Sequence, residues 1–162
     1  MAISDDGHFC AGIGADGHIE VGDPAGDQLH GKLFPLAKAV SIDLAPDGRW
    51  LAVGTVSGDV ELRPRTGPDA FALRPIVLSG HSRPVGAVAF SPDGRRLLSV
   101  GGDARMIIWT VESEPARLLV LSLRSAAGAR DLMPSQLRFA PDGGQLGVLT
   151  SEGRLRLFDL RE

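Results

Sequence analysis

GHSRPVGAVAFSPDGRRLLSVGGDARMIIWT, residues 80–110, is the stretch that decides the fold. A short apolar run in it is followed by Pro-Asp-Gly, residues 92–94, and then by a second apolar run. Proline presets φ and glycine accepts a positive φ, so this tripeptide closes a tight turn between two strands. A further turn at Asp103-Ala104 leads into a third run with apolar positions two residues apart. The stretch therefore predicts three antiparallel strands.

The same 21-residue pattern occurs four times without a gap, at residues 3–23, 44–64, 90–110 and 139–159. The glycines of the first turn lie 41, 46 and 49 residues apart, near the length of one four-stranded blade of a β-propeller. The segments between the copies each supply one more apolar run, which we expect to be the outermost strand of the preceding blade. No stretch has a sustained helical period, so we expect an all-β fold.

This spacing predicts a single region, residues 1–162, with four blades at about 1–34, 38–79, 80–123 and 134–162. The first blade has only a stub of an inner strand, and the fourth lacks its outer strand. Four such blades form an arc or partial propeller, which leaves two blade faces and a strand edge open to pairing. We expect either that the chain is part of a longer propeller or that two copies form a homodimer and close a ring of eight blades. A compact ring of four blades is the remaining alternative.

Residues 80–110 resemble a WD repeat almost throughout, and all four copies share its turns and strand pattern. The resemblance implies four-stranded WD-type blades and a buried hydrogen-bonded set in the third copy, formed by His81, Ser99, Asp103 and Trp109. We expect this structural tetrad to stabilise its blade and not to catalyse a reaction. At the position of Trp109 the other copies carry Gly22, Arg63 and Phe158. Those blades are therefore expected to depend on apolar packing.

The composition excludes several classes of protein. The chain is 43% apolar with a net charge of −3, which fits a globular protein and argues against a general nucleic-acid binder. Its single cysteine excludes an internal disulfide and disfavours a cysteine-based zinc site. No apolar run is long enough to span a membrane, and acidic residues stand where a signal peptide is basic. We expect a soluble, cytoplasmic protein.

Several chemical signals have simpler explanations. Residues 12–17, GIGADG, match a dinucleotide fingerprint, but a strand and not a helix follows them. The histidines lack the paired spacing of a metal site, and the Asp-rich turns lack a calcium-loop pattern. Cys10 shares its position with leucines of the other copies, which indicates a buried, inert thiol. We therefore predict no cofactor, no metal and no catalytic residue.

Fifteen of the seventeen basic residues are arginine, a residue suited to protein recognition. The longest irregular connection, residues 124–134, should lie on the same rim of the propeller as residues 81–83. In similar proteins this rim binds peptides or proteins, so we predict four contact residues there: Arg83, Arg105, Arg130 and Asp131. The predicted function is a non-enzymatic protein–protein interaction scaffold. The alternative is a regulatory or sensor propeller segment of a larger protein, such as a kinase or NTPase.

Overall fold

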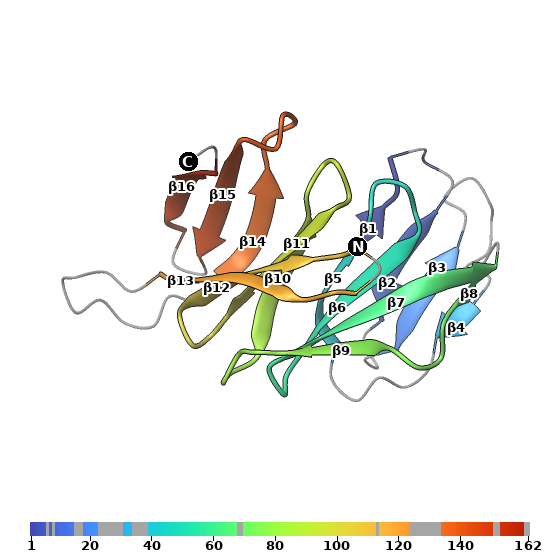
Figure 1. Ribbon diagram of the computed structural model, residues 1–162. Coiled ribbons are helices and arrows are strands. Elements are labelled where there is room, and N and C mark those ends of the chain that lie inside the picture. Colours follow the sequence, from blue (N-terminus) through green and yellow to red (C-terminus); the bar gives the residue numbers. More distant parts are fainter. Residues whose placement is uncertain are drawn as a thin grey trace.

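The computed structural model consists of four antiparallel sheets that follow one another in chain order (Figure 1). It describes residues 1–5, 7, 9–14, 18–22, 31–33, 39–67, 70–112, 114–123, 134–150 and 153–160. Blade 1 consists of β1 (Ala2–Ile3), β2 (Cys10–Ile13), β3 (Ile19–Gly22) and β4 (Gly31–Leu33). Blade 2 consists of β5 (Ala39–Leu44), β6 (Trp50–Thr55), β7 (Asp59–Gly67), β8 (Ala70–Phe71) and β9 (Ile76–Ser79). Blade 3 consists of β10 (Val85–Phe90), β11 (Arg96–Gly101), β12 (Arg105–Thr110) and β13 (Arg117–Ser122). Blade 4 consists of β14 (Pro134–Phe139), β15 (Gln145–Thr150) and β16 (Leu155–Asp159). The described residues include no helix, and the predicted all-β class is confirmed.

The predicted turns form as the sequence requires. The first turn of each blade ends in a glycine with φ between 66° and 69°, whose N–H donates to the carbonyl three residues earlier. These glycines are Gly7, Gly48, Gly94 and Gly143. The second turn has a positive φ at Gly58 and Gly153, and also at Ala104, where φ is 57°. The backbone of Ala104 thus adopts a left-handed conformation that glycine adopts at lower cost.

The inner strands of blades 2 to 4 share an irregularity that sequence patterns do not reveal. Each has a shift of register near its start, after Ala39, Val85 and Pro134. A β-bulge of this kind bends a strand and increases its twist. Because it recurs at equivalent positions, it belongs to the repeat itself.

The hydrophobic core is divided into three parts, each lying between two successive blades. The first joins blades 1 and 2 around Phe9 and Leu51, and the second joins blades 2 and 3 around Leu62 and Trp109. The third joins blades 3 and 4 around Met106. Alternate residues of each strand face opposite neighbours, so every inner blade contributes to two cores. Among the described residues, blade 1 shares a core with blade 2 only and blade 4 with blade 3 only.

Blade 2 departs from the common pattern on its outer side. Its third strand, β7, extends to Gly67 and forms a hairpin with β8 before β9 returns to pair with the first half of β7. The hairpin packs against blade 1, where Phe71 meets Phe9 edge-to-face with the ring centroids 5.4 Å apart. The Arg65 guanidinium lies 4.7 Å above the Phe9 ring. These contacts join blades 1 and 2 at their outer side.

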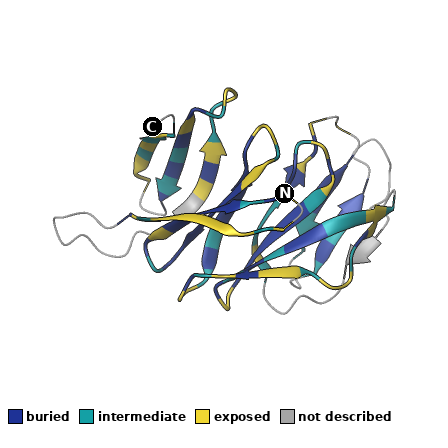
Figure 2. Ribbon diagram, in the orientation of Figure 1, coloured by how far each residue is buried: buried dark blue, intermediate teal, exposed yellow. Residues whose placement is uncertain are grey.

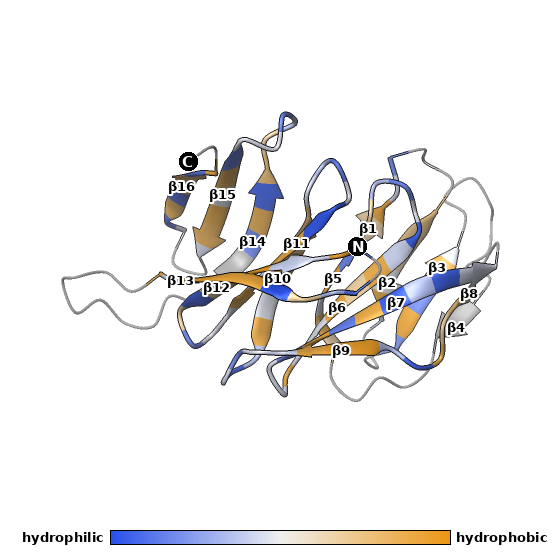
Figure 3. Ribbon diagram, in the orientation of Figure 1, coloured by the Kyte–Doolittle hydropathy of each residue, from blue (hydrophilic) through white to orange (hydrophobic). Residues whose placement is uncertain are grey.

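Exposed apolar side chains gather on the outer strands. Figure 2 shows β13 as largely exposed, although Figure 3 shows it as a mainly hydrophobic strand. In blade 4 the described residues form only three strands, and Leu155 and Leu157 of β16 are 63% and 69% exposed. Blades 1 to 3 each have a fourth strand that covers the corresponding edge.

Candidate functional site

The structure brings together the four residues of the predicted tetrad. Trp109 Nε1 donates to Ser99 Oγ over 2.9 Å, and Ser99 Oγ lies 2.8 Å from His81 Nε2. His81 Nδ1 lies 3.0 Å from Asp103 Oδ1. Ser99, Trp109 and the His81 side chain are buried. The four side chains thus form one chain of hydrogen bonds across blade 3.

The roles of donor and acceptor follow from the two ends of this chain. An indole N–H can only donate and a carboxylate can only accept. Ser99 therefore accepts from Trp109, and His81 Nδ1–H donates to Asp103. With a neutral imidazole, Nε2 is then an acceptor and the Ser99 hydroxyl donates to it. In this arrangement each polar atom that links the four tetrad side chains has a hydrogen-bond partner. The pairing offsets the cost of burying these atoms.

Asp103 connects the tetrad to the surface of the blade. Its Oδ2 accepts from the Ser82 N–H over 3.0 Å, and its Oδ1 also accepts from the Arg105 N–H over 3.2 Å. Burial raises the pKa of Asp103, but hydrogen bonds from Ser82 and His81 outweigh burial and hold that pKa below its usual value. The carboxylate thus fixes the loop before β10 and the turn before β12 in one arrangement.

Two glycines are required by the packing of the tetrad. A Cβ on Gly101 would lie 2.6 Å from His81 Nδ1 and 2.8 Å from Asp103 Oδ1. A Cβ on Gly80 would lie 2.8 Å from Ile107 Cδ1 and 3.0 Å from the Trp109 ring. The tetrad therefore excludes a side chain at Gly101, and a side chain at Gly80 would require Ile107 to shift.

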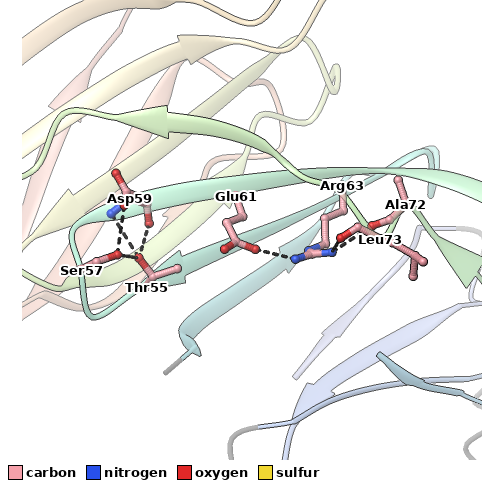
Figure 4. A network of polar contacts seen from close by, with 7 residues as sticks. All are labelled: Thr55, Ser57, Asp59, Glu61, Arg63, Ala72 and Leu73. Atoms are coloured by element: carbon pink, nitrogen blue, oxygen red, sulfur yellow. Dashed lines mark hydrogen bonds and ion pairs between the residues drawn. The ribbon is translucent and has the colours of Figure 1, made fainter. Parts of the chain in front are cut away.

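Blade 2 contributes a second turn to the same rim. Thr55 Oγ1 donates to the Asp59 carbonyl, and the Ser57 hydroxyl donates to the Asp59 carboxylate (Figure 4). The Ser79 hydroxyl also donates to this carboxylate. A Cβ on Gly58, inside this turn, would lie 2.5 Å from the His81 carbonyl oxygen. The turn of blade 2 and the loop of blade 3 therefore form one continuous surface.

Two predicted contact residues lie on this surface. Arg83 follows Ser82, and Arg105 begins β12, so Asp103 holds the backbone beside both arginines. Both residues are exposed, and neither guanidinium bonds to any of the described residues. Arg130 and Asp131 lie outside the described residues.

Arg63 overturns the expectation that blade 2 depends on apolar packing alone. This residue stands where blade 3 has Trp109 and is only 3% exposed. Its Nη1 donates to the carbonyls of Ala72 and Leu73, each over 2.9 Å, and its Nη2 lies 2.7 Å from Glu61 Oε2 (Figure 4). Two of these acceptors are backbone carbonyls, which a side-chain pattern does not reveal. Blade 2 thus has a polar cluster of its own.

Asp43 is a second functional group that the sequence interpretation missed. When the four repeats are aligned, blade 3 has alanine at the position of Asp43. Asp43 Oδ2 accepts from the Phe90 N–H over 2.7 Å. Burial raises the pKa of Asp43 to about 6, against hydrogen bonds from Phe90 and Leu44 and the charge of Arg138. The carboxyl also lines a hollow of about 340 Å³ beside the inner strands. The available signal was an acid at a position where blades 1 and 3 have alanine.

The Ser99, His81 and Asp103 side chains have the connectivity of a catalytic triad, but their environment does not allow catalysis. Ser99 is 0% exposed, and its oxygen already accepts from Trp109. A nucleophile must reach its substrate, and this hydroxyl cannot. Among the described residues, no three His, Cys, Asp or Glu side chains group closely enough to hold a metal ion. In the same part of the chain, no helix is both long and apolar enough to span a bilayer.

Comparisons with known proteins agree with this architecture. The family WD domain, G-beta repeat, matches residues 74–110. An uncharacterized WD repeat-containing protein of Synechocystis sp. is 31% identical over 90% of this chain and 39% of its own length. The meiotic recombination protein rec14 of Schizosaccharomyces pombe is 39% identical over 65% of this chain and 33% of its own length. Dipeptidyl-peptidase 5 of Aspergillus fumigatus is 30% identical over 78% of this chain and 20% of its own length.

The sheets, their turns and the connection between blades define a protein built from β-propeller blades. With the family match across the tetrad-bearing repeat, the chain belongs to the WD-repeat family, whose repeats mediate protein–protein interaction. It spans about two-fifths or less of the length of the relatives described above.

Proposed function

We propose that this chain is a non-enzymatic interaction scaffold that binds an acidic segment of a partner protein through the rim of blade 3. The observation that carries the proposal is the pair of exposed guanidinium groups at Arg83 and Arg105, without a partner among the described residues. Arginine binds carboxylates through two parallel hydrogen bonds, which favours Asp- or Glu-rich segments.

The rigidity of the rim supports this function. Asp103 accepts from the backbone N–H groups of Ser82, next to Arg83, and of Arg105 itself. The turn at Gly58 packs on the carbonyls of His81 and Arg83. Binding groups that are fixed before the partner arrives lose less conformational entropy on association. The tetrad is therefore expected to serve binding indirectly, by positioning the rim.

The length of the relatives supports a second, compatible role. Each of those described above is more than twice as long as the part that this chain matches. A propeller segment within a larger regulatory protein would use the same rim. In that role the arginine pair would bind an acidic segment of the same protein or of its partner.

A labelled polyglutamate peptide tests the proposal directly. Fluorescence anisotropy should detect binding that weakens as salt rises, because exposed charges are screened. The double variant Arg83→Glu/Arg105→Glu should bind about tenfold more weakly or worse, since it places like charges together. The matched control is Arg95→Glu/Arg96→Glu, which makes the same change of charge at two exposed arginines at the other end of blade 3. Equal losses in both variants would assign the binding to overall charge and reject the rim.

A further inference from the structure

The inner strands carry opposite charges on either side of a small residue. The penultimate residue of the inner strand is Asp43 in blade 2, Ala89 in blade 3 and Arg138 in blade 4. These three residues line one hollow of about 380 Å³, which Asp5 of blade 1 also lines. Because Ala89 is small, it leaves space between the charged side chains. The hollow thus collects one cation and two acidic groups from three different blades.

These charged side chains have no side-chain partner on the protein. Asp43 accepts hydrogen bonds only from backbone N–H groups. The Arg138 guanidinium donates only to the Leu137 carbonyl, over 3.3 Å. Within the described part of the chain, no side chain forms a hydrogen bond or ion pair with Asp5, Asp43 or Arg138. A hollow with unpaired charges of both signs is suited to a ligand that carries both.

Asp43 is the acid of this hollow that gains most from a ligand cation. Burial raises its pKa to about 6, although the charges of Arg138 and of the Met1 amino group lower it. These two cations therefore do not compensate fully for the water that the carboxylate has lost. An ammonium group beside Asp43 favours the ionised carboxylate and replaces part of that hydration. Asp5 is exposed and adds a second negative charge to the same hollow.

Apolar side chains complete the hollow. Ile3 is 49% exposed, and Phe139 and Pro141 are also accessible to solvent. Contact with them favours a ligand that has an apolar group in addition to its charges. The volume lies near the lower end of the range for ligand pockets, which indicates a small molecule.

We propose that this hollow binds a free α-amino acid with an apolar side chain. The ammonium group of the ligand lies between Asp43 and Asp5, and its carboxylate pairs with Arg138. The ligand side chain packs on Ile3 and Phe139. Arginine suits the carboxylate because its planar guanidinium forms two parallel hydrogen bonds. The arginine pair of the rim does not line the hollow, so this proposal is independent of the proposed function.

Three related probes test the two charged contacts separately. They are phenylalanine, phenylalaninamide, which lacks the carboxylate, and N-acetylphenylalanine, which lacks the ammonium group. Each is titrated into the isotope-labelled chain, and binding is followed by NMR through the shifts of backbone amides. Phenylalanine should bind saturably, and each analogue should bind about tenfold more weakly or worse, because it lacks one charged contact.

Variants assign each contact to a residue. Arg138→Gln should weaken phenylalanine binding about tenfold but phenylalaninamide binding much less. Asp43→Asn should weaken phenylalanine binding by a similar factor but N-acetylphenylalanine binding much less. The exposure of Arg138 and the acceptor that Asp43→Asn retains should keep both variants folded. The matched control, Arg117→Gln, changes an exposed arginine of β13 outside the hollow and should leave all three affinities unchanged.

The pH dependence tests the contact between the ammonium group and Asp43. Phenylalanine stays zwitterionic in mild acid, but its binding should weaken as the pH falls below about 6, because Asp43 loses its charge. Asp43→Asn should remove this dependence. An absence of saturable shifts with both phenylalanine and leucine, up to their solubility limits, overturns the proposal. Equal losses in Arg138→Gln and Arg117→Gln, or a pH profile that Asp43→Asn leaves unchanged, assign the binding to another surface and overturn the proposal as well.

Discussion

Blades 2 and 3 bury a large side chain with polar atoms at the same position, but the two side chains bond to different partners. In blade 3 the large buried residue near the end of the third strand is Trp109, which donates to a side chain of its own blade. In blade 2 the same position holds Arg63, which donates to two backbone carbonyls and to Glu61. The comparison shows that the repeat buries a large side chain at this position in both blades. It does not fix the partners to which that side chain bonds.

The largest effect is expected where a buried charge loses its partner. Arg63→Leu removes the donor to Ala72 and Leu73 and leaves Glu61 without its cation, so it should destabilise the chain by about 3 kcal/mol. Urea denaturation followed by circular dichroism measures the change. Arg49→Leu is the control, because its ion pair with Asp47 is exposed and should contribute no more than about 0.5 kcal/mol. Equal shifts would show that the Arg63 cluster contributes no special stability.

The corresponding change in blade 3 should be smaller. Trp109→Phe removes the indole N–H and leaves a void, at a cost of about 1 to 3 kcal/mol, but it breaks no charged pair. Trp50→Phe is the matched control, because Trp50 is only partly buried and packs at the edge of the same core. Denaturation midpoints of the two variants measure the difference. If both substitutions shift the midpoint equally, the hydrogen bond to Ser99 contributes nothing beyond ring packing.

The sequence predicted more of blade 3 than of blade 2 for a physical reason. The all-β class and the positive-φ glycines followed from local turn chemistry, and His81 and Asp103 were identified through the resemblance of blade 3 to a WD repeat. The Arg63 cluster depends on carbonyls of residues 72 and 73, which an additional hairpin, β7–β8, brings back to β7. Backbone acceptors have no sequence signature. The same holds for Asp43, whose partner is the Phe90 N–H.

Asp43 joins the two blades and should give their interface a pH dependence. Its pKa of about 6 lies above that of an unfolded aspartate, so the folded state binds the proton more tightly. Stability should therefore rise as the pH falls from 7 towards 4. Asp43→Asn keeps an oxygen acceptor for Phe90 and should stabilise the chain at pH 7 by about 1 to 2 kcal/mol.

The pH profile separates Asp43 from the tetrad. The lowered pKa of Asp103 means that its contribution is present above the pKa of an unfolded aspartate and is lost as the pH falls through its folded value. Wild type should thus be most stable at mildly acidic pH, and Asp43→Asn should lack the rise but keep the loss below about pH 4. Urea midpoints across this range measure both. A variant whose profile runs parallel to that of wild type would assign the rise to another group.

The smallest effect is expected at the turn where the blades differ by one methyl group. Blade 2 has Gly58, with φ of 95°, and blade 3 has Ala104, with φ of 57° and 2% exposure. Ala104→Gly relieves about 1 kcal/mol of left-handed strain. It also removes a buried methyl worth about 0.8 kcal/mol and loosens the unfolded chain by about 0.4 to 1 kcal/mol. The net change should be a destabilisation of no more than about 1 kcal/mol, measurable by urea denaturation with tryptophan fluorescence. A clear stabilisation would mean instead that strain at Ala104 outweighs the packing of its methyl group, and that blade 3 tolerates this residue only because the tetrad holds the turn.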